Sequence, residues 1–260
     1  MCGRYAATKN PATLAAEFDA IDGLGDDAPR PDHNVAPTKS VVSVVTRHPR
    51  DAEGMPEPEV TERGLRVMRW GLIPHWAKDK SIGARMINAR ADTAPGKPAF
   101  KSSLAKRRCL IPADGWYEWK RDGKAKQPYF MTRTDGRSLA FAGLWSTWHE
   151  PGADPDAAPL ISCAVLTTDA VAKLTDIHDR MPLLLAQDDW ARWLDPDLAA
   201  TDDITALLSA PDLAAVDALE LRPVSTKVNS VRNNGPELVE RLAEETPLDA
   251  PSLFDEQSAS

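Results

Sequence analysis

The sequence predicts an α+β fold built on a mostly antiparallel sheet with flanking helices. Three observations predict it. Strand-like runs outnumber helical ones, they follow one another directly, and tight-turn signals such as RDGK and TDGR separate them. With 260 residues and 42% hydrophobic content, the chain is long enough to bury a sizeable core. No internal repeat is visible.

The elements can be placed in order along the chain. A helix is expected from Pro11 to about residue 20, because Asn10 precedes it and proline suits a first helical turn. The other elements follow from β-rich runs and from helical spacing of apolar residues. Expected strands are SVVSVVT (40–46), LRVMRW (65–70), RCLIPA with GWYEWK (108–120), QPYFMTR (127–133), SLAFAGLW (138–145), LISCAVLTT (160–168) and VDALELRPV (216–224), and expected helices are 187–194 and 202–209.

Two segments stand outside this pattern. Residues 47–62 are rich in proline and charge, so we expect an exposed loop there. From residue 237 the chain becomes acidic and then rich in serine and proline, which is typical of disorder. The predicted domain therefore spans residues 1–236, and residues 237–260 form an acidic tail.

The composition excludes several classes of protein. The longest apolar runs are far too short to cross a bilayer, and no charged segment followed by an apolar one marks a secretory signal. Cys2, Cys109 and Cys163 are odd in number and widely spaced, which favours a reducing cytoplasm over a disulfide framework. The sequence contains no HExxH, Cys/His cluster, GxxxxGK[ST] or GxGxxG motif, so we expect neither a metal nor a cofactor.

The charge is unevenly distributed. The net charge is −8, yet residues 63–126 carry 16 Lys and Arg against 5 Asp and Glu. A basic block inside an acidic chain suits a phosphate-binding surface, because the local field steers a polyanion. Solvated surface lysines and arginines would explain it equally well.

The second residue is the first candidate for chemistry. Removal of Met1 would leave Cys2 with a free α-amine and a thiol, whose reference pKa values of roughly 8 and 8.5 make both partly nucleophilic near neutral pH. Gly3 allows close approach of a bulky partner. An incidental cysteine at a frayed end is the alternative.

Two acid–base candidates lie later in the chain. In GWYEWK, a strand would put Glu118 on the same face as Trp116, where apolar surroundings raise the pKa of a carboxyl group. In TDIHDRMP, His178 stands between Asp176 and Asp179, which could fix its tautomer and favour its charged form. Two alternatives remain: Glu118 could form a surface ion pair, and His178 could have a purely structural role.

Other residues are candidates for binding. Asn88 and Arg90 in MINARAD would point the same way from an extended segment and could bind one ligand. The alternative is that Asn88 is a helix cap and Arg90 an ordinary surface arginine. Asn34, before Pro37, suits a turn as well as a site. Trp76 lies among Lys and Arg residues, as stacking on single-stranded nucleic acid requires, whereas a core role is the ordinary one for tryptophan.

Taken together, the motifs resemble the SOS response-associated peptidase (SRAP) family, whose members are abasic-site processing proteins. The resemblance spans roughly residues 2–235. It rests on MCGRY, NVAPT (34–38), WGLIPHWAKD (70–79), INARADT (87–93), RCLIPADGWYEWK (108–120), QPYF (127–130), AGLW (142–145) and IHDRMP (177–182). It implies a mixed fold on a curved, largely antiparallel sheet, and covalent capture of abasic sites in single-stranded DNA.

The resemblance also implies roles for residues. Cys2 would be the nucleophile, with Asn88, Glu118 and His178 around the reacting sugar. Arg4 and Arg90 would contact phosphates. With Asn34, Trp76 and Trp119 they make up the expected DNA-binding residues. The amine and thiol of Cys2 could close a thiazolidine on the aldehyde of an abasic sugar, shielding the lesion during the DNA damage response.

Competing functions remain. A peptidase or amidohydrolase with an N-terminal cysteine, as the family's older name suggests, would use Cys2 as a thiolate, and Met1 removal could be its own reaction. A non-catalytic single-strand DNA-binding module would leave Cys2 without a purpose. We expect abasic single-stranded DNA as the partner, no membrane, a monomer, unknown replication-fork partners, and a cytoplasmic location that is nucleoid-associated on DNA.

Overall fold

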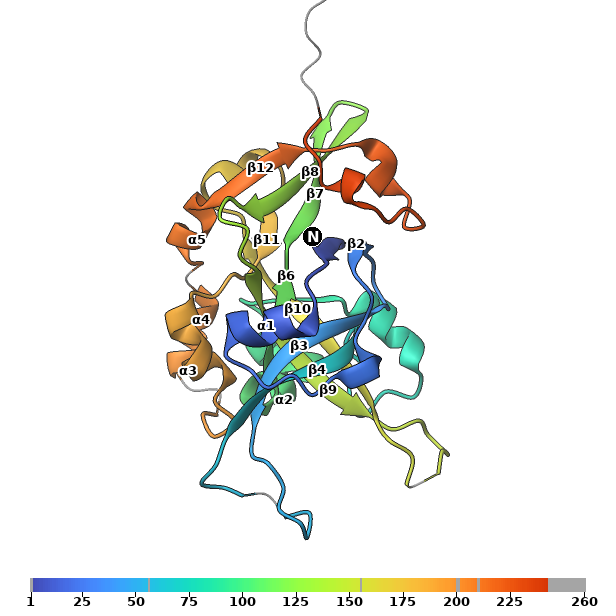
Figure 1. Cartoon of the computed structure of the whole chain (residues 1–260), viewed down its shortest axis with the longest axis vertical. Coiled ribbons are helices and arrows are strands. Elements are labelled where there is room, and N and C mark those ends of the chain that lie inside the picture. Colours follow the sequence, from blue (N-terminus) through green and yellow to red (C-terminus); the bar gives the residue numbers. More distant parts are fainter. Residues whose placement is uncertain (1, 56, 155, 200–201, 210, 243–260) are drawn as a thin grey trace, which may run out of the picture.

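The computed structural model describes residues 2–242 except 56, 155, 200–201 and 210. The described residues form two sheets with helices packed around them (Figure 1). The strands are β1 (Tyr5–Ala7), β2 (Asp32–Val35), β3 (Ser40–Arg47), β4 (Glu62–Trp70), β5 (Asn88–Arg90), β6 (Arg108–Ala113), β7 (Gly115–Asp122), β8 (Ala125–Arg133), β9 (Leu139–Trp148), β10 (Leu160–Asp169), β11 (Arg180–Pro182) and β12 (Leu219–Pro223).

Short helices connect the strands. The α-helices are α1 (Pro11–Phe18), α2 (Pro98–Lys106), α3 (Trp190–Leu194), α4 (Asp202–Ser209) and α5 (Leu213–Asp217). The 3-10 helices are η1 (Gly25–Asp27), η2 (Lys80–Arg85), η3 (Ala94–Gly96), η4 (Ala172–Asp176), η5 (Gln187–Asp189), η6 (Thr226–Asn229) and η7 (Pro236–Leu238).

The second sheet closes on itself. Its strands pair in the order β10, β4, β3, β6 and β9, and β9 pairs back with β10. Most of these pairings are antiparallel, while β4 and β5 both pair in parallel with β10. The first sheet has the order β12-β8-β7-β1-β2 and is antiparallel throughout its described pairs. The expected α+β class on a mostly antiparallel framework is thus confirmed, with two sheets in place of one.

The alternation of side chains divides the core into an outer and an inner layer. On the outer face, Leu110 and Leu144 pack with the helices, among them Phe18 of α1 and Trp193 of α3. The opposite side chains of the same strands, such as Ile111, point into the closed sheet. This inner cluster also contains Tyr5, Trp116 and Met131 of the first sheet, and Cys2, which precedes β1. The chain start therefore lies where the two sheets meet.

Local signals explain the elements that the sequence predicted. Asn10 caps α1, accepting a hydrogen bond from the Thr13 backbone N–H at 2.8 Å, with Pro11 in the first turn. The long runs became β3, β4 and β6 to β10. The expected strand over 216–224 is shorter, because residues 213–217 form α5 before β12. Helix α2 and the short strands β1, β2, β5 and β11 were not predicted. The four strands have too few residues to show a period.

The domain boundary predicted at residue 236 falls within η7. Leu238 is buried beside Phe130 and Tyr117, and the Leu242 backbone N–H donates to the Pro223 carbonyl at 2.9 Å. The folded part therefore extends past residue 236, because Leu238 has apolar surface to bury. The rest of the predicted tail, 243–260, lies outside the described residues.

Within the described residues, no helix combines the length and apolar character needed to cross a membrane. Nor do His, Cys, Asp and Glu side chains there form a group of three or more suited to hold a metal.

Candidate active site at the junction of the two sheets

Cys2 is completely buried in the inner cluster, three residues before Tyr5 of β1. Burial raises the pKa of its thiol well above the usual value, and the nearby Glu118 carboxylate raises it further. Burial also raises the pKa of Cys109 and Cys163. The pKa of the thiol therefore does not distinguish Cys2 from the other two cysteines, because burial raises all three. Its neighbours do, because they can take and return protons.

Asn88 binds the backbone of Cys2. Its strand β5 lies beside β10, with Asn88 opposite Val165, and its Nδ2 donates to the Cys2 carbonyl at 2.7 Å. The Asn88 Oδ1 atom is buried and accepts no hydrogen bond from any described residue. A buried amide oxygen that accepts no hydrogen bond destabilises a protein core. It is well suited to accept a hydrogen bond from a bound ligand.

Glu118 lies on β7 with Trp116 on the same face, as its sequence predicted. Glu118 is only 4% exposed. Burial raises the pKa of its carboxyl group to about 7, and the charge of Asp179 makes a smaller contribution in the same direction. The neutral and ionised forms of Glu118 are therefore both populated near neutral pH. That property is what a group needs to donate and accept protons in turn.

His178 lies between η4 and β11 and faces Glu118. Its Nε2 is 4.0 Å from Glu118 Oε2, while its Nδ1 lies 2.8 Å from Asp179 Oδ1 and 3.0 Å from the Arg180 backbone nitrogen. Burial lowers the pKa of the imidazole, and the Asp179 carboxylate opposes that change. The histidine and the glutamate therefore form an acid–base pair beside the chain start.

Arg4 and Asn34 hold a C-terminal segment in place. The Arg4 guanidinium donates to Asn34 Oδ1 and the Val228 carbonyl, both at 2.9 Å, and to the Asn229 carbonyl at 3.3 Å. It also lies 5.4 Å from the ring centre of Trp119. Asn34 is fully buried, so its side chain has no exposed surface for DNA and its effect on binding would pass through Arg4.

The remaining predicted DNA contacts lie nearer the surface. Trp119 Nε1 donates to Asn229 Oδ1 at 2.7 Å. Arg90 is exposed and paired with Asp92 at 2.6 Å. Trp76 is 51% exposed in the loop between β4 and η2. Within the described part of the chain, no hydrogen bond or ion pair links these three residues to one another.

The C-terminal segment 225–235, STKVNSVRNNG, also reaches this region and contains none of the predicted site residues. Asn34 Nδ2 donates to three of its carbonyls, those of Val228, Ser230 and Asn233, at 3.0 to 3.3 Å. Its density of Ser, Asn and Gly is a turn signal. It did not indicate that the segment would lie beside the chain start.

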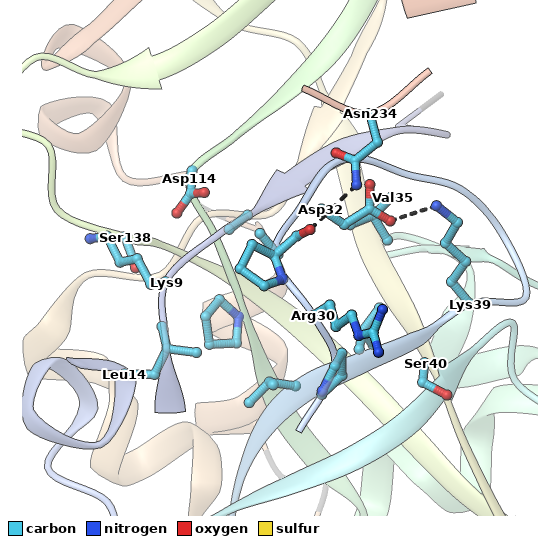
Figure 2. A pocket seen from close by; sticks show the side chains of 17 residues that line it. Lys9, Leu14, Arg30, Asp32, Val35, Lys39, Ser40, Asp114, Ser138 and Asn234 are labelled. Atoms are coloured by element: carbon cyan, nitrogen blue, oxygen red, sulfur yellow. Dashed lines mark hydrogen bonds and ion pairs between the residues drawn. The ribbon is translucent and has the colours of Figure 1, made fainter. Parts of the chain in front are cut away.

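A separate cavity of about 310 Å³ lies near the other end of β1 (Figure 2). Lys9 and Asp114 lie at one side of it, and Asp32 with its ion-pair partner Lys39 at the other. Its lining, as far as the structure describes it, contains none of the nine predicted site residues. The candidate site is thus at the sheet junction and not in this cavity.

Comparison with known proteins gives one consistent result. The abasic site processing protein YoqW of Bacillus subtilis (strain 168) is 37% identical over 241 residues, covering 92% of this chain and 99% of that protein. The abasic site processing protein HMCES of Xenopus tropicalis is 34% identical over 272 residues, covering 91% and 77%. A crystal structure of a Bacteroides thetaiotaomicron protein shares the fold with a TM-score of 0.74 at 24% identity, covering 93% of this chain and 100% of that one.

The family model described as SOS response associated peptidase (SRAP) matches residues 1–231. That match includes the four residues at the sheet junction and most of the segment bound by Arg4 and Asn34. The chain belongs to the SRAP family.

Proposed function

We propose that this protein senses abasic sites in single-stranded DNA and links itself to them covalently through Cys2 after removal of Met1, shielding the lesion during the DNA damage response. The observation that carries the proposal is the meeting of Cys2, Asn88, Glu118 and His178 at the sheet junction. Relatives named abasic site processing proteins, which match most of the chain, support the choice of substrate.

The chemistry needs an amine and a thiol on one residue. The ring-opened abasic sugar presents an aldehyde at C1′. The α-amine of Cys2 would add to it, give a carbinolamine, and lose water to form a Schiff base. The thiol sulfur would then add to the imine carbon, while its proton passes to the imine nitrogen, closing a thiazolidine. Closure removes the Schiff base that would otherwise promote strand cleavage by β-elimination.

The neighbouring groups suit the proton transfers. A buried thiol with a raised pKa needs a base close by, and Glu118, whose pKa is about 7, can take a proton and return it to the carbinolamine oxygen. His178, which faces Glu118, would give a proton to O4′ as the furanose ring opens. Asn88 holds the Cys2 carbonyl, and its free Oδ1 can accept a hydrogen bond from the sugar or the amine.

Affinity for DNA would come from the surrounding surface. Trp119 and Arg4 form a stacked aromatic and cationic pair of the kind that binds single strands. Arg90 would exchange its partner Asp92 for a phosphate, and Trp76 offers exposed ring surface. Asn34 would act by holding Arg4.

We infer an enzyme with lyase-like Schiff-base chemistry that uses no cofactor, acts as a monomer, and works in the cytoplasm on nucleoid DNA. The groups already in the chain supply the nucleophile and the acid–base pair. A peptidase acting through Cys2 is the competing function, and the experiment below separates the two.

The test is to mix the full chain with abasic single-stranded DNA and to look for a complex that survives denaturing electrophoresis. Intact mass should show loss of Met1. Cys2→Ala should abolish the adduct and keep weaker non-covalent binding, while Cys109→Ala, which removes another buried thiol, should crosslink normally. An adduct from Cys2→Ala equal to that of the wild type would overturn the proposal. Peptide cleavage without a DNA adduct would favour the peptidase.

A further inference from the structure

The Nδ1 atom of His178 has two partners that demand opposite protonation states. The Arg180 backbone N–H points to Nδ1 at 3.0 Å and needs a lone pair there. The Asp179 carboxylate lies 2.8 Å from the same atom and needs a proton there. One nitrogen cannot accept the first hydrogen bond and donate the second at the same time.

Each partner therefore selects one form of the ring. With the Arg180 N–H bound, the neutral imidazole keeps its proton on Nε2, the nitrogen that faces Glu118. With Asp179 bound, the proton sits on Nδ1, and Nε2 carries the lone pair that acts as a base. When the ring is charged, both nitrogens carry protons and only Asp179 can be the partner of Nδ1.

The fold holds the backbone that carries both partners, while the Asp179 side chain itself is exposed. Arg180 begins β11 opposite Asp169, and its guanidinium binds Asp169 together with the Thr167 carbonyl. The Asp179 carbonyl accepts from the Ala170 N–H at 2.9 Å. The fold thus fixes the backbone of residues 179 and 180, from which the carboxylate and the N–H reach Nδ1.

We propose that Asp179 is a positioning residue that allows His178 to release its Nε2 proton and take it back. The proposal rests on the function proposed above. In the forward direction the charged ring gives its Nε2 proton to O4′ of the opening sugar. The neutral ring left behind keeps the proton on Nδ1, where it is hydrogen-bonded to the Asp179 carboxylate. In reverse, Nε2 takes the proton back. Without Asp179, the Arg180 N–H holds the neutral ring in the form that retains the Nε2 proton.

Other charges around the ring set the direction of the pH dependence. Glu118 and Arg121 face it from β7, and Asp179 from its own segment. Asp179 raises the pKa of the imidazole, whereas Arg121 and the positive charge of the chain's amino terminus lower it. Removing Asp179 should therefore lower the pKa of His178.

The first measurement is a pH titration of the ring nitrogens by NMR on the full chain with labelled histidine, which requires no DNA. Asp179→Ala should lower the pKa of His178 and shift the neutral ring to the Nε2–H form. Asp179→Glu should restore part of both. Asp176→Ala removes an exposed carboxylate three residues earlier and should change neither. An unchanged pKa and tautomer in Asp179→Ala would overturn the proposal.

The second measurement is the single-turnover rate of crosslinking against pH at saturating abasic DNA. The rate should fall as pH rises through the pKa of His178, and in Asp179→Ala that fall should move to lower pH, with a rate about tenfold lower near neutrality. A rate profile identical to the wild type would also overturn it. If the wild type forms no adduct at all, the proposed function fails, and the NMR titration still decides whether Asp179 controls the ring.

Discussion

At the scale of single residues, burial sets the chemistry of Glu118. The side chain is nearly inaccessible, and removing it from water raises the pKa of its carboxyl group from 4.5 to about 7. The unfolded chain ionises this group near pH 4.5 and the folded chain does so only near pH 7. The stability contributed by its protonated form is therefore present below pH 4.5 and is lost as pH rises towards 7.

We predict that Glu118→Gln, which is never charged, is more stable than the wild type at pH 8, by about 3 kcal/mol at most, and equally stable near pH 4. Urea denaturation at the two pH values measures it. Glu220→Gln is the matched control with the opposite sign. Arg222 and Arg241 lower the pKa of Glu220 to about 2, so that variant should lose stability at pH 8. No gain in Glu118→Gln would mean that its charge is not desolvated.

At the scale of elements, the segment 225–235 is held to the chain start by side chains more than by a sheet. Asn34 on β2 supplies donors to three of its carbonyls and an acceptor to Arg4. Arg4 shares the Val228 carbonyl with Asn34, reaches one further carbonyl of the segment, that of Asn229, and lies over Trp119. One buried amide thus fixes both the segment and the proposed DNA-binding pair.

We predict that Asn34→Leu destabilises the fold by about 3 kcal/mol, because it leaves several buried polar groups without partners. Hydrogen exchange of residues 225–235 should become faster, and non-covalent affinity for single-stranded DNA should fall with it. Asn10→Ala, which removes only the cap of α1, should cost about 1 kcal/mol and leave exchange in 225–235 unchanged. Unchanged exchange in Asn34→Leu would contradict the role given to this amide.

At the scale of the whole molecule, the charge is divided between a basic block and an acidic remainder. Residues 63–126 hold a balance of +11, from 16 Lys and Arg against 5 Asp and Glu, although the chain carries −8 in total. In the structure this block includes β4, β5 and β7, so part of it lies beside the junction that holds Cys2 and Glu118. Binding of a polyanion there should release counterions.

We predict that affinity for single-stranded DNA falls linearly with salt on a log–log plot. Arg90→Ala should make the slope shallower by about 1, the contribution of one phosphate contact. Asp92→Asn should bind more tightly at low salt, since it frees the Arg90 guanidinium. Arg192→Ala, in the exposed Arg192–Asp189 pair outside the block, should change nothing. A salt-independent affinity would contradict a phosphate-binding block.

The sequence by itself determined the fold class, the long strands, the first helix and the residue types of the candidate site. These depend on local signals: β-branched and apolar runs in β3 and β10, the Asn10 cap, and a glutamate flanked by aromatic rings. Such signals act within a few residues, so they can be read without knowing what packs on them. The strand face shared by Trp116 and Glu118 followed from side-chain alternation alone.

Only the tertiary structure decided which of these residues meet. Closure of the second sheet brings Asn88 on β5 and His178 before β11 to the start of the chain and to Glu118 of the other sheet. Strand pairing over long separations leaves no local pattern, and three-residue strands are too short to show a period. The depth of burial that sets the pKa of Glu118, and the competition of Asp179 with the Arg180 backbone at His178, likewise exist only once distant segments have packed together.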